Sequence, residues 1–141
     1  MKKYISIFMA ATLLLLGVLP VSAAQGSGTV SPMYINANDV SMKFVIDEYG
    51  IAIIRVTGEG NSKCTGFYVV TYLEHWDNNT WNRVNIGMPN NEWTYSTGGD
   101  MLLATYNHTV TEAGEYRAVS RVLVYGTGQN ESIFLSKFFE L

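Results

Sequence analysis

The sequence predicts an all-β fold, an antiparallel β-sandwich of about seven strands, and three observations support this prediction. From Tyr34 onward, short segments rich in β-branched and aromatic residues are separated by turns that contain Gly, Asn and Asp. Several of these segments alternate apolar and polar residues, which is typical of strands that face a core on one side. The same region lacks a convincing 3.6-residue apolar periodicity of the kind that amphipathic helices show. A closed barrel of similar strand number is the alternative.

The first 24 residues have the build of a secretory signal peptide. Lys2 and Lys3 form a positive start, residues 5–19 are apolar and uncharged, and small residues permit cleavage near Ala23 or Ala24. The apolar run is short for a membrane span, which needs about 20 residues, so an uncleaved anchor is the less favoured alternative. We therefore expect a secreted, extracellular protein with no stable membrane insertion after cleavage.

The remainder of the chain is expected to hold one domain. Residues 25–33 are Gly/Ser-rich and predict a flexible leader, and residues 34–141 form the β-sandwich domain. Without the two signal-peptide lysines, seven basic residues remain against twelve acidic ones, a net charge of −5. Such scattered acidic charge does not provide the positive surface that nucleic acid requires. Cys64 is the only cysteine, so an internal disulfide is excluded and packing must stabilise the domain.

Local patterns give the first two strands. Val40–Val45 alternates apolar and polar residues, and a turn at residues 47–50 leads into the β-branched segment Ile51–Val56. Residues 58–62, with two glycines, an asparagine and a serine, predict a loop.

The next two strands form a predicted hairpin. Phe67–Trp76 is a long aromatic and β-branched run, residues 77–80 are a polar turn, and Trp81–Ile86 returns as the second strand. Residues 87–99 contain a proline, two asparagines and a Gly pair, and we expect them to be irregular.

The last three strands are Met101–Val110, Gly114–Tyr125 and Ser132–Phe139. Alternation along the middle one separates a small, mostly apolar set of residues from a charged set. We expect the first set to face the core: Tyr116, Ala118, Ser120, Val122 and Val124. We expect the second set to form the wetter face: Glu115, Arg117, Val119, Arg121 and Leu123. Within it, Arg117 and Arg121 are expected to be solvated or paired with glutamates of neighbouring strands.

The segment Glu112-Ala113-Gly114-Glu115-Tyr116 resembles the tyrosine corner of immunoglobulin-like domains. This resemblance implies an immunoglobulin-like sandwich in which Gly114 and Tyr116 are structural and the Tyr116 hydroxyl bonds to the chain just upstream. Disulfide-bearing members carry a cysteine two residues after the tyrosine, where this chain has Ala118, so a disulfide-free version is implied. The corresponding strands would be B (Ile51–Val56), C (Phe67–Trp76), C′ (Trp81–Ile86), E (Met101–Val110), F (Gly114–Tyr125) and G (Ser132–Phe139).

A second resemblance covers residues 35–141. The segment from Leu73 to Val84, the later Gly114-Glu115-Tyr116-Arg117 and the pair Glu131-Ser132 are similar to small secreted single-domain β-sandwich proteins of Gram-positive (Firmicute) bacteria. Their function is unassigned. The resemblance implies a sandwich and carries no catalytic residue over, and Trp76 is an addition to the common pattern.

No catalytic residue, cofactor or metal site is predicted. His75 and His108 are the only histidines, and they lack the spacing of metal-ligand motifs. We expect both to be isolated polar strand residues. Cys64 has no histidine beside it in sequence, so we expect a partly buried, inert thiol rather than a reactive one. The domain is therefore predicted not to be an enzyme.

Aromatic residues are the predicted binding residues. Tyr72 and Trp76 share one face of their strand, and Trp81 stands across the turn from Trp76. Such residues form a stacking platform for a sugar or a partner protein, or else a cross-strand pair that stabilises the hairpin by up to about 1 kcal/mol. Trp93 and Tyr95 are a second candidate group, either exposed or packed as a lid on the sandwich edge.

We therefore expect a non-enzymatic domain whose partner is an extracellular protein or glycan. A carbohydrate-binding module is the narrower alternative. A small secreted hydrolase or toxin is an alternative of a different class. A third is structural assembly through an exposed edge strand near Phe138 and Phe139.

Overall fold

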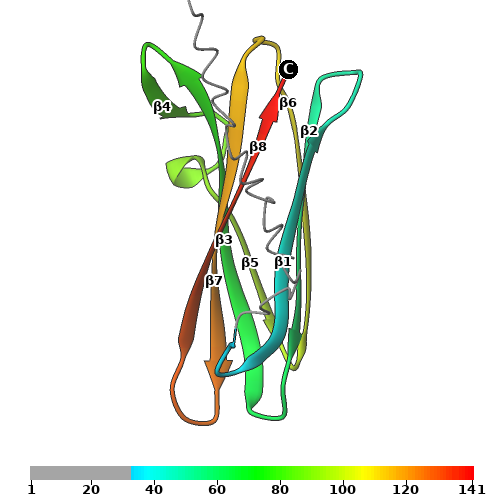
Figure 1. The fold of residues 1–141 in the computed structure, drawn as a ribbon, viewed down its shortest axis with the longest axis vertical. Coiled ribbons are helices and arrows are strands. Elements are labelled where there is room, and N and C mark those ends of the chain that lie inside the picture. The colour runs from blue at the N-terminus through cyan, green and yellow to red at the C-terminus, as the bar shows by residue number, and fades with distance from the viewer. Residues whose placement is uncertain (1–32) are drawn as a thin grey trace, which may run out of the picture. The chain divides into compact units, whose positions relative to one another are not determined.

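The computed structural model describes residues 33–141, which form eight strands and one short 3₁₀ turn (Figure 1). The predicted signal peptide and the predicted leader up to residue 32 lie outside the described residues. The strands are β1 (Ala37–Ile46), β2 (Ile51–Gly60), β3 (Cys64–Asp77), β4 (Thr80–Arg83), β5 (Trp93–Gly98), β6 (Met101–Thr109), β7 (Glu115–Gly126) and β8 (Glu131–Glu140). The 3₁₀ turn η1 (Pro89–Asn91) precedes β5.

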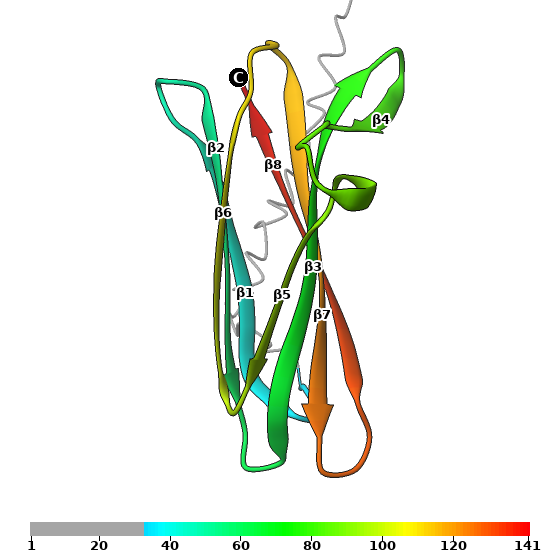
Figure 2. The same cartoon turned by 180° about the vertical axis from the view of Figure 1, so that it is seen from behind.

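The strands form two antiparallel sheets that pack face to face (Figures 1 and 2). One sheet has the order β1-β2-β6, and the other has the order β4-β3-β7-β8 with β5 also paired to β3. The predicted all-β antiparallel sandwich is therefore confirmed, and the chain forms two separate sheets rather than one closed barrel. The strands predicted as B and E lie in one sheet and those predicted as C, F and G lie in the other, which is how immunoglobulin-like sandwiches divide them.

Alternation along the strands determines the core, which lies between the two sheets. The predicted inward set of β7 is confirmed, because each of its five members is at most 2% exposed. The largest fully buried apolar side chains come from both sheets: Phe67, Ile54, Leu73, Leu102, Val56 and Val69. Two hydroxyls inside this core satisfy one another, since Thr71 Oγ1 and Ser120 Oγ are 2.7 Å apart.

Three predicted boundaries are wrong. Trp93–Gly98 forms strand β5 inside the segment expected to be irregular, so the described residues hold eight strands rather than about seven. Strand β2 continues through Gly60, where a loop was expected. A Cβ on Gly60 would collide with the side chain of Cys64, so glycine permits a close approach there rather than ending the strand. Strand β4 ends at Arg83 instead of Ile86.

The tyrosine corner fixes the turn between β6 and β7. The Tyr116 hydroxyl donates a hydrogen bond to the Glu112 carbonyl at 2.8 Å, as the sequence predicted. Gly114 has a φ of 133° and exchanges two backbone hydrogen bonds with Leu141. A Cβ on Gly114 would lie 3.0 Å from His75 Nε2, so a larger residue would be both strained and crowded.

The long strand β3 shares one edge between two partners. Residues 66–71 pair with β5, and residues 74–77 pair with β4. The chain leaves this edge after Val84, whose N–H donates to the Leu73 carbonyl at 2.9 Å, and returns through η1 as β5. The β3–β4 hairpin therefore projects at the end of the sandwich that also holds the β6–β7 turn (Figures 1 and 2).

Candidate functional site

The β3–β4 hairpin is closed by two asparagines. Asn78 and Asn79 have φ values of 52° and 61°, which is the backbone of a type I′ turn and suits asparagine. This turn makes Trp76 and Trp81 direct register partners, with ring centroids 5.2 Å apart and planes tilted by 58°. The predicted juxtaposition of the two tryptophans is therefore confirmed.

Three of the predicted binding residues lie together on the outer face of the five-stranded sheet. We call this surface the aromatic face; it consists of Tyr72, Trp76, Trp81, Phe134 and Phe138, with Arg83, Arg117 and Arg121 among them. Strand alternation places them there, because the neighbouring residues of β3, β7 and β8 fill the core. Three of the aromatic rings are substantially exposed, Trp76 at 39%, Phe138 at 62% and Phe134 at 71%.

Arg117 holds the centre of the aromatic face. Its guanidinium carbon lies 4.5 Å from the centroid of the Trp81 ring, and its Nε donates to the Glu74 carboxylate at 2.7 Å. Glu74 is only 9% exposed, so its charge needs this partner. Phe138 covers the other part of Trp81 with ring centroids 5.8 Å apart. The expectation that Arg117 pairs with a glutamate of a neighbouring strand is confirmed.

Arg83 makes a second set of contacts, at the β4 edge of the aromatic face. The guanidinium of Arg83 stacks over Tyr72 at 3.9 Å and bonds the Glu92 carboxylate at 2.7 Å and the Asn90 carbonyl at 2.9 Å. Partial burial opposes the charge of Arg83, but the hydrogen bond and negative charge of Glu92 outweigh it and raise the pKa of Arg83. Arg83 and Tyr72 are thus a preorganised pair.

A cavity of about 240 Å³ opens on the aromatic face between Arg83 and Arg121. Its wall includes Tyr72, Val119, Arg121 and Phe134. Arg121 makes no ion pair with any residue in the range 33–141. The cavity therefore combines apolar rings with a cationic group that retains its bonding capacity.

Trp93 and Tyr95 do not join the aromatic face. They are register partners of Thr71 and Val69, whose side chains face the core, so they lie on the inner side of the sheet at its edge. Trp93 is half-buried and stacks on Tyr106 of the opposite sheet with centroids 5.4 Å apart. The arrangement matches the lid on the sandwich edge, although Tyr95 remains 39% exposed.

A polar pocket, which the sequence did not predict, lies at the end of the sandwich that holds the β3–β4 hairpin and the β6–β7 turn. We call it the end pocket; its volume is about 370 Å³ and its wall includes His75, Asp77, Asn82, His108, Thr111 and Tyr116. His75 and Asn82 are register partners on the inner side of the hairpin, and His108 comes from the end of β6. The two histidines, expected to be isolated, therefore share one cavity.

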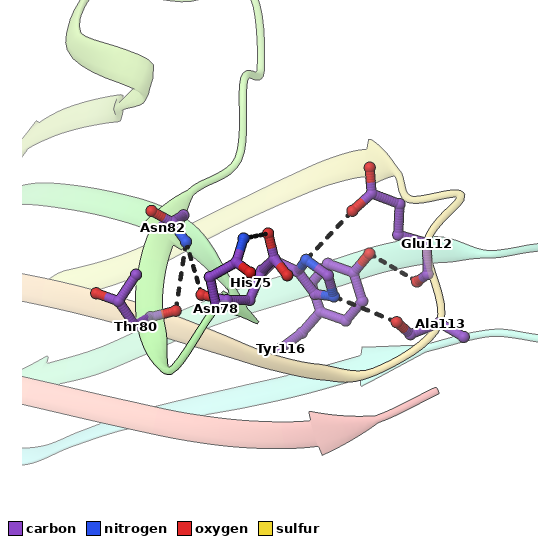
Figure 3. A network of polar contacts seen from close by, with 8 residues as sticks. His75, Asn78, Thr80, Asn82, Glu112, Ala113 and Tyr116 are labelled. Atoms are coloured by element: carbon purple, nitrogen blue, oxygen red, sulfur yellow. Dashed lines mark hydrogen bonds and ion pairs between the residues drawn. The ribbon is translucent and has the colours of Figure 1, made fainter.

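His75 links the hairpin to the β6–β7 turn (Figure 3). Its Nδ1 lies 3.3 Å from the Glu112 carboxylate and its Nε2 lies 3.3 Å from the Ala113 carbonyl. Its ring packs on Tyr116 with centroids 4.6 Å apart. No local sequence signal indicates this cluster, because its members come from β3 and from a turn about 40 residues further along the chain.

The remaining candidate groups do not converge. Cys64 has intermediate exposure and lies eleven residues from His75 along β3, about 36 Å at the usual strand rise. Within residues 33–141, no three His, Cys, Asp or Glu side chains come together as metal ligands. Over the same range, no helix has the length and apolar character needed to span a bilayer.

Comparison of the chain with protein-family models, with curated proteins and with solved structures gives no match.

Proposed function

We propose that this protein is a secreted, non-enzymatic domain that binds an extracellular protein through its aromatic face. The observation that carries the proposal is the exposure of Phe134 and Phe138 on the face that also holds Trp81, which Phe138 and Arg117 contact. Trp, Tyr and Arg dominate the binding energy of protein interfaces, and exposed apolar side chains gathered on one surface mark interaction sites. The expected signal peptide supports an extracellular partner.

The chemistry of the face favours a protein over a glycan. A sugar-binding platform needs an open, flat ring with polar groups beside it. Here Trp81 is covered by Arg117 and Phe138, and its plane is tilted from that of Trp76. A protein partner complementary to this face presents apolar side chains to the phenylalanines and a carboxylate to Arg121. A carbohydrate-binding module that uses this face remains the second outcome of the test.

The other two alternatives receive less support. Lys137 lies on the inward side of edge strand β8 and is exposed, and an inward-pointing charge opposes pairing with another strand. This disfavours assembly through β8. A hydrolase needs a nucleophile beside a base, whereas Cys64 lies at the opposite end of β3 from His75.

The proposal is tested by screening the purified full chain against an array of extracellular proteins and a glycan array. Each hit is then measured by surface plasmon resonance with the double variant Phe134→Ser/Phe138→Ser. We expect binding to weaken by at least about 30-fold, the effect of losing one interface hot spot. Arg121→Glu is expected to weaken it as well, because it reverses the charge that the partner must meet.

The matched control is Met101→Ser/Leu103→Ser on the outer face of the three-stranded sheet, where the side chains are 65% and 62% exposed. This variant should bind as the unaltered chain does. Protein hits that both double variants bind equally well would contradict the proposal. Binding to glycans alone, lost in the Phe134/Phe138 variant, would replace it with the carbohydrate-binding alternative.

A further inference from the structure

The end pocket is a second site, separate from the aromatic face. The β3–β4 hairpin divides the two, because Trp76 and Trp81 point to one side of it and His75 and Asn82 to the other. We propose that the end pocket binds a neutral, hydroxyl-rich ligand, namely a single sugar ring, either free or at the end of a glycan. This inference does not depend on the protein partner proposed above.

The size and place of the pocket suit a small ligand. Its volume of about 370 Å³ falls in the range of small-molecule sites. It forms between the inner side of the hairpin, the end of β6 and the β6–β7 turn, which lie at the same end of the sandwich (Figures 1 and 3). Strands and the tyrosine corner therefore position its lining residues.

The pocket offers both hydrogen-bond donors and hydrogen-bond acceptors. Among the contacts within residues 33–141, the side chains of His108 and Thr111 form no hydrogen bond, although both residues line the pocket. Asn82 donates through its amide nitrogen to the carbonyls of Asp77 and Thr80, which leaves its amide oxygen as an acceptor. Sugars present adjacent hydroxyls that donate and accept at the same time, and mixed groups of this kind satisfy them.

One wall of the pocket is formed by two stacked rings. The rings of His75 and Tyr116 both line it, and they lie 4.6 Å apart with their planes 31° from parallel. His75 is held in place by the Glu112 carboxylate and the Ala113 carbonyl, so the wall is preorganised. Tyr116 is only 2% exposed and covers one face of the His75 ring, so the other face of His75 is the surface that would pack against the C–H groups of a sugar at little entropic cost.

The charges around the pocket favour a neutral ligand. Asp77 and Glu112 would repel an anion, while Arg83, which borders both the end pocket and the cavity of the aromatic face, has its guanidinium paired with Glu92. A cation would compete with existing partners, because Glu112 already contacts His75 and Asp77 already accepts from the Asn78 amide. A metal ion would require convergent ligands that the part of the chain described here does not bring together.

The test is an NMR titration of the ¹⁵N-labelled full chain with methyl glycosides of glucose, galactose, mannose and N-acetylglucosamine, followed by a glycan array. We expect shift changes in the end pocket for at least one glycoside. The isosteric variant Thr111→Val and the variant His108→Phe, which keeps the ring beside Trp93, should each weaken binding by about tenfold or more. If glycans bind and free glycosides do not, the ligand is a glycan terminus.

Two controls separate this site from the aromatic face. Thr105→Val changes the same strand on its outer side and should bind glycosides normally. Phe134→Ser/Phe138→Ser should also leave glycoside binding unchanged, even if it abolishes binding of a protein partner. The inference is overturned if no glycoside or glycan binds, or if the shifts map to Trp76 and Trp81 and disappear in the phenylalanine variant.

Discussion

The hydroxyl of Tyr116 makes the one hydrogen bond that defines the corner between β6 and β7. Tyr116→Phe removes the donor and leaves the Glu112 carbonyl without it, so we expect a loss of about 1 to 2 kcal/mol in the free energy of unfolding. Urea denaturation followed by tryptophan fluorescence measures this. Tyr125→Phe, whose hydroxyl makes no hydrogen bond within residues 33–141, is the control and should be nearly neutral. Equal losses of unfolding free energy in the two variants would show that the Tyr116 hydroxyl does not stabilise the corner.

Glu74 and Arg117 form the most enclosed ion pair among the described residues. Arg117→Ala would leave the carboxylate of Glu74 at 9% exposure without a countercharge and would uncover the Trp81 ring. We expect a loss of about 2 kcal/mol, discounted from the fully buried case because Arg117 is partly solvated. Chemical denaturation of both single variants and of Arg117→Ala/Glu74→Gln gives the coupling. Additive effects would show that the pair is unimportant.

For single residues, the sequence predicted burial and contacts where these depend on neighbours within one strand or one turn. Residues two apart on one strand could be assigned to the same face, so the buried set of β7 and the Trp76–Trp81 pair were predictable. The contacts of Phe138 with Trp81, and of His75 with Glu112, join segments far apart along the chain. They depend on the order of strands in the sheet, which alternation alone does not encode.

The β3–β4 hairpin depends on a turn that needs positive φ at two successive positions. Asn79→Ala should destabilise it by about 1 kcal/mol, because alanine adopts the left-handed conformation less readily than asparagine. Asn79→Gly is the matched control and should be neutral or slightly stabilising. The readout is hydrogen exchange of the β4 amides alongside global unfolding. Similar behaviour of the two variants would contradict the turn type.

Backbone pairing explains strand β5, which the sequence did not predict. Strand β5 is short and lies among proline, asparagine and glycine, which locally indicate a loop. The exposed backbone groups along residues 66–71 of β3 need partners, and Trp93–Gly98 supplies them. The long, β-branched strands were predictable because their side chains carry the signal, whereas β5 is determined by the edge that it covers.

The molecule as a whole should lose stability at alkaline pH. Burial raises the pKa of Tyr106 to about 12, and burial followed by the nearby Glu112 charge raises that of Tyr116 above its usual 10. The folded state thus holds these protons more tightly than the unfolded state. Their contribution is complete below about pH 10 and declines as pH rises toward 12. Urea denaturation from pH 8 upward should show this decline.

Tyr106→Phe provides the control for this pH dependence. The Tyr106 hydroxyl is buried, and although Thr71 lies near enough to offset part of the pKa shift, no hydrogen bond of normal geometry forms within residues 33–141. Its removal should make the domain more stable near pH 7 and flatten the alkaline decline. A decline of unchanged slope would mean that other groups cause it.

Strands β4 and β5 share one edge of β3, and this arrangement also affects how the sequence of the domain can diverge in evolution. Strand β4 pairs only with β3, so the hairpin tip can lengthen, shorten or change sequence without breaking another strand pair. The tip nevertheless borders both the aromatic face and the end pocket. A single insertion beside Asn78 would alter both of the proposed binding surfaces at once while the buried scaffold stays intact, so one change at this tip could alter two specificities together.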